Sequence, residues 1–393
     1  MAKFQPTPFL LAGILMAPSA LAAAAPDSWA VATAETIMKR NPGTPADRLA
    51  RWSYWKGYTL YGFEMLWRST GDQRYWDFIK RGMDPFVDEK GNLTADVRLN
   101  SLDNIMAGNL IVALYEQTRD ERYRTAAAQI RKAFDTYPRN SDGGFWHNPR
   151  LTGEMWIDGV FMGQMFLIRY GKSIGDREYC FDEATRQIAI FARHGLKGDT
   201  GLYYHAWAEQ PEKTRWADPK TGLSSEVWSE GLGWYALILA ETLAVLPADH
   251  ARRPEVVDIF QRLAAGLKRT QDPKTGRWFQ VVDKGDQPDN WTDTSGSAMF
   301  TYAIQRGIDL GLLKSSDYAA VVDKGYHGII ANAKINDEGL VDIYDACDGL
   351  GVQENYARYI NFKKSVNAKE AVAGFLWATA IVERPALEKK RKR

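Results

Sequence analysis

The stretch TGDQRY at residues 70–75 recurs as TRDERY at 118–123 and as IGDREY at 174–179. In each copy an aspartate precedes a tyrosine by three residues, and helix-like stretches lie on both sides. An aspartate at this point can cap the helix that follows, while the tyrosine packs into the turn. The three copies therefore predict three antiparallel helical hairpins.

A second repeated element, a glycine turn that leads into large side chains, follows each hairpin. Its copies are DEKGNL (88–93), SDGGFWH (141–147), GDTGLYYH (198–205), PKTGRWFQ (273–280) and NDEGLVDI (336–343), with Gly91, Gly144, Gly201, Gly276 and Gly339 as the turn glycines. Such turns predict short strands or loops. The spacing gives a unit of about 60 residues and hence about six hairpins. We predict an all-α (α/α)6 barrel with short strands in the active-site loops, as a single domain over residues 26–385.

The first 25 residues have the pattern of a secretory signal peptide. Lys3 supplies a charge, FLLAGILMA (9–17) forms an apolar core, and Ala20-Leu21-Ala22 fits a cleavage site, so cleavage is expected after residues 22 to 25. The apolar core is too short for a membrane span, and we expect an exported protein, either periplasmic or secreted. Export permits disulfides, so a bridge between Cys180 and Cys347 is possible, although two distant cysteines do not predict one.

The overall charge is balanced, with 50 basic and 49 acidic residues and a formal net charge of +1. This balance argues against nucleic acid as a partner, and residues 386–393 form only a short basic tail. Fourteen tryptophans and 18 tyrosines exceed what a core of this size needs. A helical core explains part of this excess, and platforms for sugar rings explain the rest.

Two aspartates are candidates for acid catalysis. Asp158 lies in EMWIDGVFMGQMFLIRY, where apolar neighbours should raise its pKa and allow it to act as a general acid. Asp103, in RLNSLDNIMAGNL, is, taken alone, better explained as a helix cap, and capping is also an alternative for Asp158. Two inward-facing carboxylates are the usual groups for glycoside cleavage, so the pair carries more weight than either residue alone.

Two of the five histidines, His147 and His205, occupy equivalent places in two of the glycine loops. They could hydrogen-bond sugar hydroxyls or a uronate carboxylate, or they could be structural. No spacing typical of a metal site accompanies them, and we predict neither a metal nor an organic cofactor.

The segment EVWSEGLGWY places Trp228 and Trp234 around the entry to a helix, where they could be core residues or stacking platforms. Glu226 and Glu230 add carboxylates, one of which could bind substrate. The chain has no GxSxG elbow, no P-loop lysine and no GxGxxG after a strand, so serine hydrolase, kinase and dehydrogenase functions lack support.

Several motifs in order resemble glycoside hydrolase family 105, the unsaturated rhamnogalacturonyl hydrolases and related unsaturated uronidases. They are RWSYWKGYTLYGFEMLW, LDNIMAG, FWHNPRLTGEMWIDGVFM, GLYYHAWAE, VWSEGLGWY, SGSAMFTYAI and EAVAGFLWATAIVE, and they span nearly all of the chain after the first 25 residues. The resemblance implies an (α/α)6 barrel that removes a 4,5-unsaturated uronic acid from the non-reducing end of oligosaccharides made by a polysaccharide lyase. A proton is added at C4 and water at C5, without a cofactor. By the same resemblance Asp158 donates the proton, and the residues that bind or orient the ring are Tyr54, Asp103, His147, His205, Trp228 and Trp234.

The chain departs from the family pattern at two places. Glu230 and Leu232 stand where well-known members have the Arg and Asn of WxRGNxW, and an acid placed like that Arg would repel a uronate. Lys369 and Glu370 stand near the place where some relatives have Asp-x-His-Gly. We therefore expect Glu230 to contact substrate in a subgroup with different recognition. Two alternatives stay open: an inverting glycosidase that acts on saturated glycans, and an exported glycan-binding protein without turnover.

Overall fold

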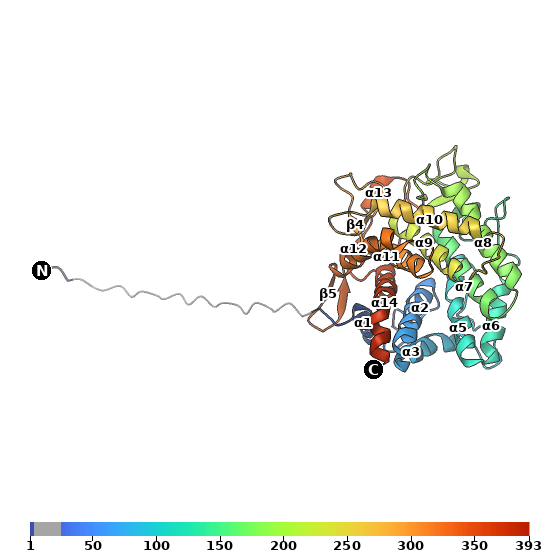
Figure 1. Cartoon of the computed structure of the whole chain (residues 1–393), viewed down its shortest axis with the longest axis horizontal. Coiled ribbons are helices and arrows are strands. Elements are labelled where there is room, and N and C mark those ends of the chain that lie inside the picture. Colours follow the sequence, from blue (N-terminus) through green and yellow to red (C-terminus); the bar gives the residue numbers. More distant parts are fainter. Residues whose placement is uncertain (4–24, 393) are drawn as a thin grey trace.

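The computed structural model describes residues 1–3 and 25–392, so the core of the predicted signal peptide lies outside the described residues (Figure 1). Within the described part, no helix combines the length and the apolarity needed to cross a bilayer. Cys180 and Cys347 are both buried and not bonded to each other.

In the described part of the chain, six helical segments form an inner ring. They are α2 (Tyr54–Thr70), α4 with α5 (Leu102–Met106 and Gly108–Thr118), α7 (Ile157–Ser173), α9 (Ser229–Val245), α11 (Thr294–Asp309) and α14 (Lys369–Arg391). Each segment packs on the next, and α14 packs on α2, which closes the ring. The outer helices are α1 (Trp29–Arg40), α3 (Gln73–Met83), α6 (Glu121–Lys132), α8 (Arg177–Gly195), α10 (Arg253–Thr270) and α12 (Ser315–Ile330). The predicted (α/α)6 barrel is confirmed.

The two ends of the chain build the sixth hairpin together. Helix α1 packs on α14, and the carboxylate of Glu383 accepts hydrogen bonds from the Ser28 hydroxyl and from the backbone N–H of Trp29, the latter at 3.1 Å. Figure 1 shows α14 beside both α1 and α2. The inner ring is therefore complete only when the last helix is in place.

The hairpin turns follow the predicted pattern at two of three places. Asp72 and Asp120 cap α3 and α6, since their side chains accept hydrogen bonds from backbone N–H groups two residues later. Asp176 differs: its φ of 53° is left-handed, its side chain makes no capping bond, and it pairs with Arg131 at 2.7 Å instead. The third predicted cap is therefore wrong, because Arg131 draws the carboxylate away from the helix.

The glycine turns adopt left-handed backbone at Gly91, Gly201, Gly276 and Gly339, as a tight turn requires. In the second copy the left-handed residue is Gly143, with φ 92°, and not the predicted Gly144. This one-residue correction places His147 and His205 each four positions after the turn glycine.

Short strands accompany these turns. They form four antiparallel pairs: β1 (Glu154–Trp156) with β2 (Ala206–Ala208), β3 (Trp278–Phe279) with β4 (Thr292–Asp293), β5 (Ala333–Ile335) with β6 (Val341–Ile343), and β7 (Ala346–Cys347) with β8 (Lys364–Ser365). Two 3-10 helices, η1 (Asp84–Phe86) and η2 (Pro211–Lys213), and the short helix α13 (Tyr356–Ile360) complete the described elements.

The last helix includes most of the predicted basic tail. Helix α14 continues through Arg391, Leu387 is buried, and Arg391 Nη1 donates to the Arg68 carbonyl at 2.8 Å. Residues 386–391 are therefore part of a packed helix and not a detached end.

The middle of the barrel is filled by aromatic rings. Tyr58 lies 4.6 Å from Trp234 and 4.8 Å from Trp377, measured between ring centroids. Many of these aromatic residues therefore belong to the core, which is one of the two explanations given above for the aromatic excess.

One end of the barrel holds a buried ion network around a cavity of about 410 Å³. Arg169 contacts Glu64 at 2.7 Å and Glu116 at 2.6 Å. Burial alone would raise the pKa of Glu64, but the guanidinium groups of Arg169 and Arg68 outweigh it and hold the pKa at about 2. The carboxylate of Glu64 therefore depends on its cationic partners.

Candidate active site

A second cavity, of about 210 Å³, lies where inner helices of the barrel begin. Its lining residues are Tyr54, Asp103, His147, Trp156, Asp158, Met162, Trp228, Glu230, Trp234, Gly349, Leu350 and Gly351. Seven of the eight predicted site residues are among them, and the eighth, His205, lies directly behind Asp158. The fold thus brings together residues that are far apart in the sequence.

The acids of the site occupy one repeated position. Asp103, Asp158, Glu230 and Glu370 are each the second residue of an inner helix: α4, α7, α9 and α14 respectively. In α11 the same position holds Ser295. The N-terminus of a helix stabilises negative charge, so the repeat directs several carboxyl groups toward one space at the end of the barrel.

Neither catalytic candidate is a helix cap. The N-cap of α4 is Ser101, whose side chain accepts from the backbone N–H of Asn104, and the N-cap of α7 is Trp156. The capping alternative for Asp103 and Asp158 is therefore wrong, and both carboxyl groups are free for other contacts.

Asp158 pairs with His205. The two atoms Asp158 Oδ2 and His205 Nε2 lie 3.2 Å apart, although the contact is not aligned as a hydrogen bond. The ring of His205 is buried, and its Nδ1 lies 2.9 Å from the hydroxyl of Tyr359. The surroundings of Asp158 are therefore less apolar than its sequence neighbours indicate.

Asp103 pairs with His147 in a similar way. Their Oδ2 and Nε2 atoms lie 3.6 Å apart, and the imidazole stacks on Trp156 at 4.3 Å between centroids. Burial raises the pKa of Asp103, although His147 acts in the opposite direction. Asp103 therefore holds a proton more readily than an exposed aspartate does.

Glu230 lies fully buried, and its Oε2 accepts a hydrogen bond from the Ser295 hydroxyl at 2.9 Å. Burial, together with the charges of Glu370 and Asp293, raises the pKa of Glu230 well above its ordinary value. A protonated Glu230 carries no charge. The repulsion of a uronate that the sequence predicted therefore does not arise while Glu230 keeps its proton.

Glu370 joins two other groups at the cavity. Its Oε1 accepts from the Tyr54 hydroxyl at 2.5 Å and pairs with Lys369 Nζ at 2.8 Å. Burial and the charge of Glu370 raise the pKa of Tyr54 well above its ordinary value, so the phenol keeps its proton. Among the described residues that line the cavity there is no lysine or arginine, but Lys369 Nζ lies 5.7 Å from the ring centre of Tyr54.

The tryptophans of the site differ in exposure. Trp228 and Trp234 are each only 1% exposed, so they support the site from behind and do not offer an open face for stacking. Trp156, which the sequence analysis did not select, lines the cavity and is partly exposed. Glu226 is not among the lining residues and pairs with Lys284 at 2.7 Å.

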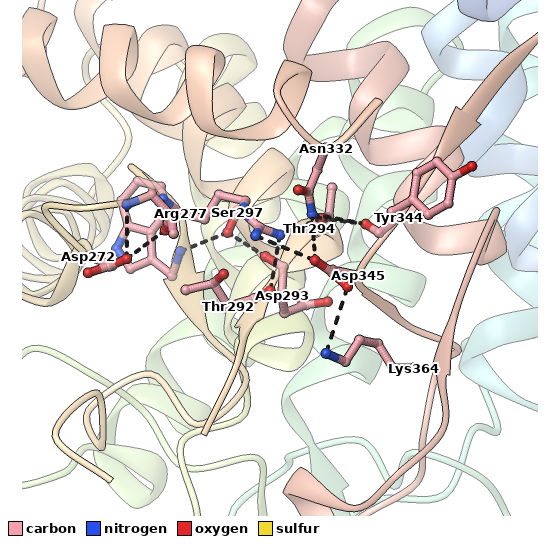
Figure 2. A network of polar contacts seen from close by, with 12 residues as sticks. Asp272, Arg277, Thr292, Asp293, Thr294, Ser297, Asn332, Tyr344, Asp345 and Lys364 are labelled. Atoms are coloured by element: carbon pink, nitrogen blue, oxygen red, sulfur yellow. Dashed lines mark hydrogen bonds and ion pairs between the residues drawn. The ribbon is translucent and has the colours of Figure 1, made fainter. Parts of the chain in front are cut away.

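One wall of the cavity comes from a late loop, residues 348–363, which the sequence motifs did not predict. The pairing of β7 with β8 closes this loop at its base, and Gly349, Leu350 and Gly351 reach the cavity. Figure 2 shows the polar network beneath it, in which Asp345 contacts Lys364 and Asn332. Nothing in the repeats marks this loop, because it has no counterpart in the other hairpins.

The same network positions the start of α11. Asp293 caps the helix by accepting from the backbone N–H groups of Ser295 and Gly296, and it also accepts from the N–H of Cys347 at 3.0 Å. Ser295 in turn holds Glu230. Asp293, the cap of α11, and Ser295, in its first turn, therefore connect the base of the late loop at Cys347 with Glu230 of α9.

The acids and histidines of the site do not form a metal centre. Within the described residues, no group of three or more His, Cys, Asp or Glu side chains has the arrangement of a metal site.

Comparison with known proteins gives the family. The family model described as Glycosyl Hydrolase Family 88 matches residues 29–385. A solved glycoside hydrolase of family 105 from C. acetobutylicum superposes with a TM-score of 0.85 and 30% identity, over 91% of this chain and 99% of that one. The chain belongs to glycoside hydrolase family 105. It is therefore a glycoside hydrolase, as the ordered motifs predicted.

The family 105 hydrolase is also similar in sequence to two other proteins. Protein Atu3128 of Agrobacterium fabrum is 37% identical over 171 residues, which cover 43% of this chain and 71% of that protein. The unsaturated rhamnogalacturonyl hydrolase YesR of Bacillus subtilis is 25% identical over 78% of this chain and 83% of its own length.

The close packing of α7 against His147 gives a first prediction. A Cβ at Gly159 would meet His147 Nδ1 at 3.0 Å and Leu102 Cδ1 at 3.0 Å. Gly159→Ala should shift the imidazole and lower kcat/KM of the family 105 hydrolase about tenfold, since small displacements of catalytic groups are costly. Gly163→Ala is the matched control, because its Cβ would also meet Leu102 at 3.0 Å but does not approach His147. Equal activities of the two variants would contradict the prediction.

Proposed function

We propose that this family 105 hydrolase removes a 4,5-unsaturated uronic acid from the non-reducing end of oligosaccharides. The observation that carries the proposal is the Asp158 carboxyl group on the cavity wall, 3.2 Å from His205, in the same small cavity as the Asp103–His147 pair. Such a cavity provides an acid at the reacting atom and further polar groups for the hydroxyls of one ring.

The proposed reaction is a hydration of the double bond. Asp158 donates its proton to C4, water adds through its oxygen at C5, and the proton that this water loses returns to the Asp158 carboxylate. The hemiketal then opens, which releases the remaining saccharide and a 5-keto-4-deoxyuronate. Asp158 thus acts first as acid and then as base, and no group is consumed.

The size of the cavity and the names of the relatives support this proposal. A volume of about 210 Å³ is below the range of ligand sites that hold larger molecules, which favours a single terminal ring. YesR is named for unsaturated rhamnogalacturonyl substrates, and a relative from Alteromonas, 23% identical over 48% of this chain, is named an unsaturated 3S-rhamnoglycuronyl hydrolase. A polysaccharide lyase supplies substrates of this kind, and we propose that it acts in the same compartment outside the cytoplasm, in keeping with the predicted signal peptide.

The proposal is tested with purified protein and a panel of lyase digests. Unsaturated rhamnogalacturonan, homogalacturonan, ulvan and glycosaminoglycan fragments all carry a conjugated double bond, whose ultraviolet absorbance falls on hydration. At least one digest should lose this absorbance. If all four keep it while a saturated glycan is cleaved, an inverting glycosidase is the correct function, and binding without any product would indicate a glycan-binding protein.

A second prediction concerns the uronate carboxylate. The side chain of Lys369 is 31% exposed and pairs with Glu370 beside Tyr54. Lys369 is the first residue of α14, where the helix dipole disfavours a cation. We expect Lys369 to bind the carboxylate in place of the family's Arg. Lys369→Met should raise KM for the unsaturated uronide about tenfold and leave kcat within a fewfold, because one charge-assisted contact is lost.

The methyl ester of the same substrate separates charge recognition from a general defect. Lys369→Met should change KM for this neutral ester little, and the exposed Lys363→Met should behave like the parent enzyme with both substrates. An equal rise in KM for acid and ester would show that Lys369 does not recognise the charge.

A further inference from the structure

Tyr359 is a buried side chain that the late loop brings against the catalytic pair. It belongs to α13 (Tyr356–Ile360), is fully buried, and places its hydroxyl 2.9 Å from His205 Nδ1. The opposite ring nitrogen, Nε2, lies 3.2 Å from Asp158 Oδ2. Tyr359, His205 and Asp158, which come from three distant segments, therefore form one chain of contacts.

The hydrogen bonds of Tyr359 determine where its proton lies. The backbone N–H of Gln353 can only donate, and it lies 3.3 Å from the Tyr359 oxygen. Burial raises the pKa of Tyr359 well above its ordinary value, although Gln353 and Ser224 act in the opposite direction. The phenol is therefore protonated, and it already accepts a hydrogen bond from Gln353. Its own proton needs an acceptor in this buried place, and His205 Nδ1 is the acceptor within reach.

The backbone holds the imidazole firmly in this position. The N–H of His205 donates to the Glu226 carbonyl at 3.1 Å, and the His205 carbonyl accepts from the N–H of Ile157 at 2.9 Å. Trp228 packs against the imidazole at 4.5 Å between ring centroids. These contacts fix the backbone on both sides of His205 and pack one neighbour against its ring, with Nδ1 beside Tyr359 and Nε2 beside Asp158.

We propose that Tyr359 is a positioning residue that keeps the proton of neutral His205 on Nε2, facing Asp158. This role in catalysis rests on the proposed function. In this arrangement the Nε2–H group faces Oδ2, which is buried, so the acidic proton of Asp158 must sit on Oδ1. Oδ1 is the oxygen left to face the cavity, where C4 of the substrate would lie. After proton transfer, the same Nε2–H group stabilises the carboxylate.

The arrangement also makes the acid depend on the late loop. Gly349, Leu350 and Gly351 of this loop line the cavity, and Tyr359 of the same loop orients His205. The loop is fixed at its base by β7 and β8 and by the network in Figure 2. A substrate that contacts the glycine wall is therefore bound by the same segment that sets the tautomer of His205.

Tyr359→Phe tests the proposal, because phenylalanine keeps the ring in its apolar surroundings and removes only the hydroxyl. The ring nitrogens of His205 are followed by nitrogen NMR of the full chain labelled at histidine, with His205→Gln used to assign the signals. In the parent enzyme Nδ1 should be the unprotonated nitrogen, and in Tyr359→Phe the protonation should redistribute toward Nδ1. The control is Tyr356→Phe, which removes a hydroxyl from the same helix. Among the described residues, this hydroxyl has one hydrogen-bond partner, Asp289, at 2.8 Å.

Kinetics provide the second readout. In Tyr359→Phe, kcat should fall about thirtyfold while KM changes less than threefold, since a misplaced proton on His205 weakens a general acid that contributes 10²–10⁴ but does not remove it. The pH profile of kcat/KM should also move, because His205 faces the titratable groups Asp158 and Tyr359. The charge of Glu226, which pairs with Lys284, acts on Tyr359. Melting curves of both variants establish that they are folded.

Each outcome decides the proposal. Unchanged nitrogen signals in Tyr359→Phe would overturn it, whether or not the enzyme turns over an unsaturated uronide. Changed signals with the parent's kcat and pH profile would also overturn it, since the tautomer would then have no catalytic consequence. A parent enzyme that is inactive on every digest would remove the proposed function, and the nitrogen signals would still report whether Tyr359 sets the tautomer.

Discussion

Replacing Asp158 with asparagine is expected to reduce kcat at least about a thousandfold, since a general acid contributes 10²–10⁴ and the returning proton uses the same group. The amide is nearly the same size as the carboxyl, and it lies beside the same His205. The fold should therefore be retained, with an unchanged melting temperature and circular dichroism spectrum. The measurement is the loss of ultraviolet absorbance from the digest that the parent enzyme prefers.

Two further variants sharpen this test. Asp103→Asn should lose less activity than Asp158→Asn, because Asp103 is expected to orient the ring and not to deliver the proton. Asp258→Asn, on the exposed face of α10, should match the parent enzyme. A larger loss for Asp103→Asn than for Asp158→Asn would move the acid to Asp103, whose pKa burial raises.

Arg169→Met is expected to destabilise the protein by about 3–5 kcal/mol, because it removes one member of a buried ion network and leaves a buried carboxylate without its main partner. Arg169 is buried and contacts both Glu64 and Glu116. Equilibrium denaturation at neutral pH measures the effect. Arg68→Met is the matched control: Arg68 also contacts Glu64 at 2.7 Å, but it is 55% exposed, so the expected cost is below about 1 kcal/mol.

The pH dependence of this effect has a definite sign. The pKa of Glu64 is about 2 in the folded protein and close to its ordinary value of 4.5 in the unfolded chain. The network therefore contributes its full stability above pH 4.5 and loses it as the pH falls toward 2. The difference between the parent enzyme and Arg169→Met should shrink over this interval. A difference that is the same at pH 7 and pH 3 would show that packing, and not charge, explains the loss.

The barrel was predictable because its evidence is local and repeated. Asp72 and Asp120 mark hairpin turns, and the glycine turns keep the period of the whole ring. The repeat also indicated His147 and His205, which occupy equivalent places in two loops, whereas Tyr54 was expected only from the resemblance to family 105. A one-residue ambiguity between Gly143 and Gly144 remained, because either glycine can adopt the left-handed backbone.

Other properties of the site depend on contacts between distant segments. The raised pKa of Glu230 results from burial and from the charges of Glu370 and Asp293, none of which can be read from VWSEGLGWY. The role of Tyr359 depends on a loop without a repeat counterpart that folds across the barrel to reach His205. Periodicity predicts which residues lie at the same end of the barrel, but not which of them contact one another.

The closure of the inner ring by α14 has a consequence for the order in which the molecule forms. During synthesis, 298 residues (71–368) separate α2 from α14, the helix that covers its side, and α1 also packs on α14. Contacts of such long sequence separation are slow to form, and a nascent chain that lacks its end exposes apolar surface on both edges of the gap. The barrel is therefore completed only after α14 has been synthesised. A C-terminal truncation at residue 368 should yield an aggregating protein and not a smaller barrel.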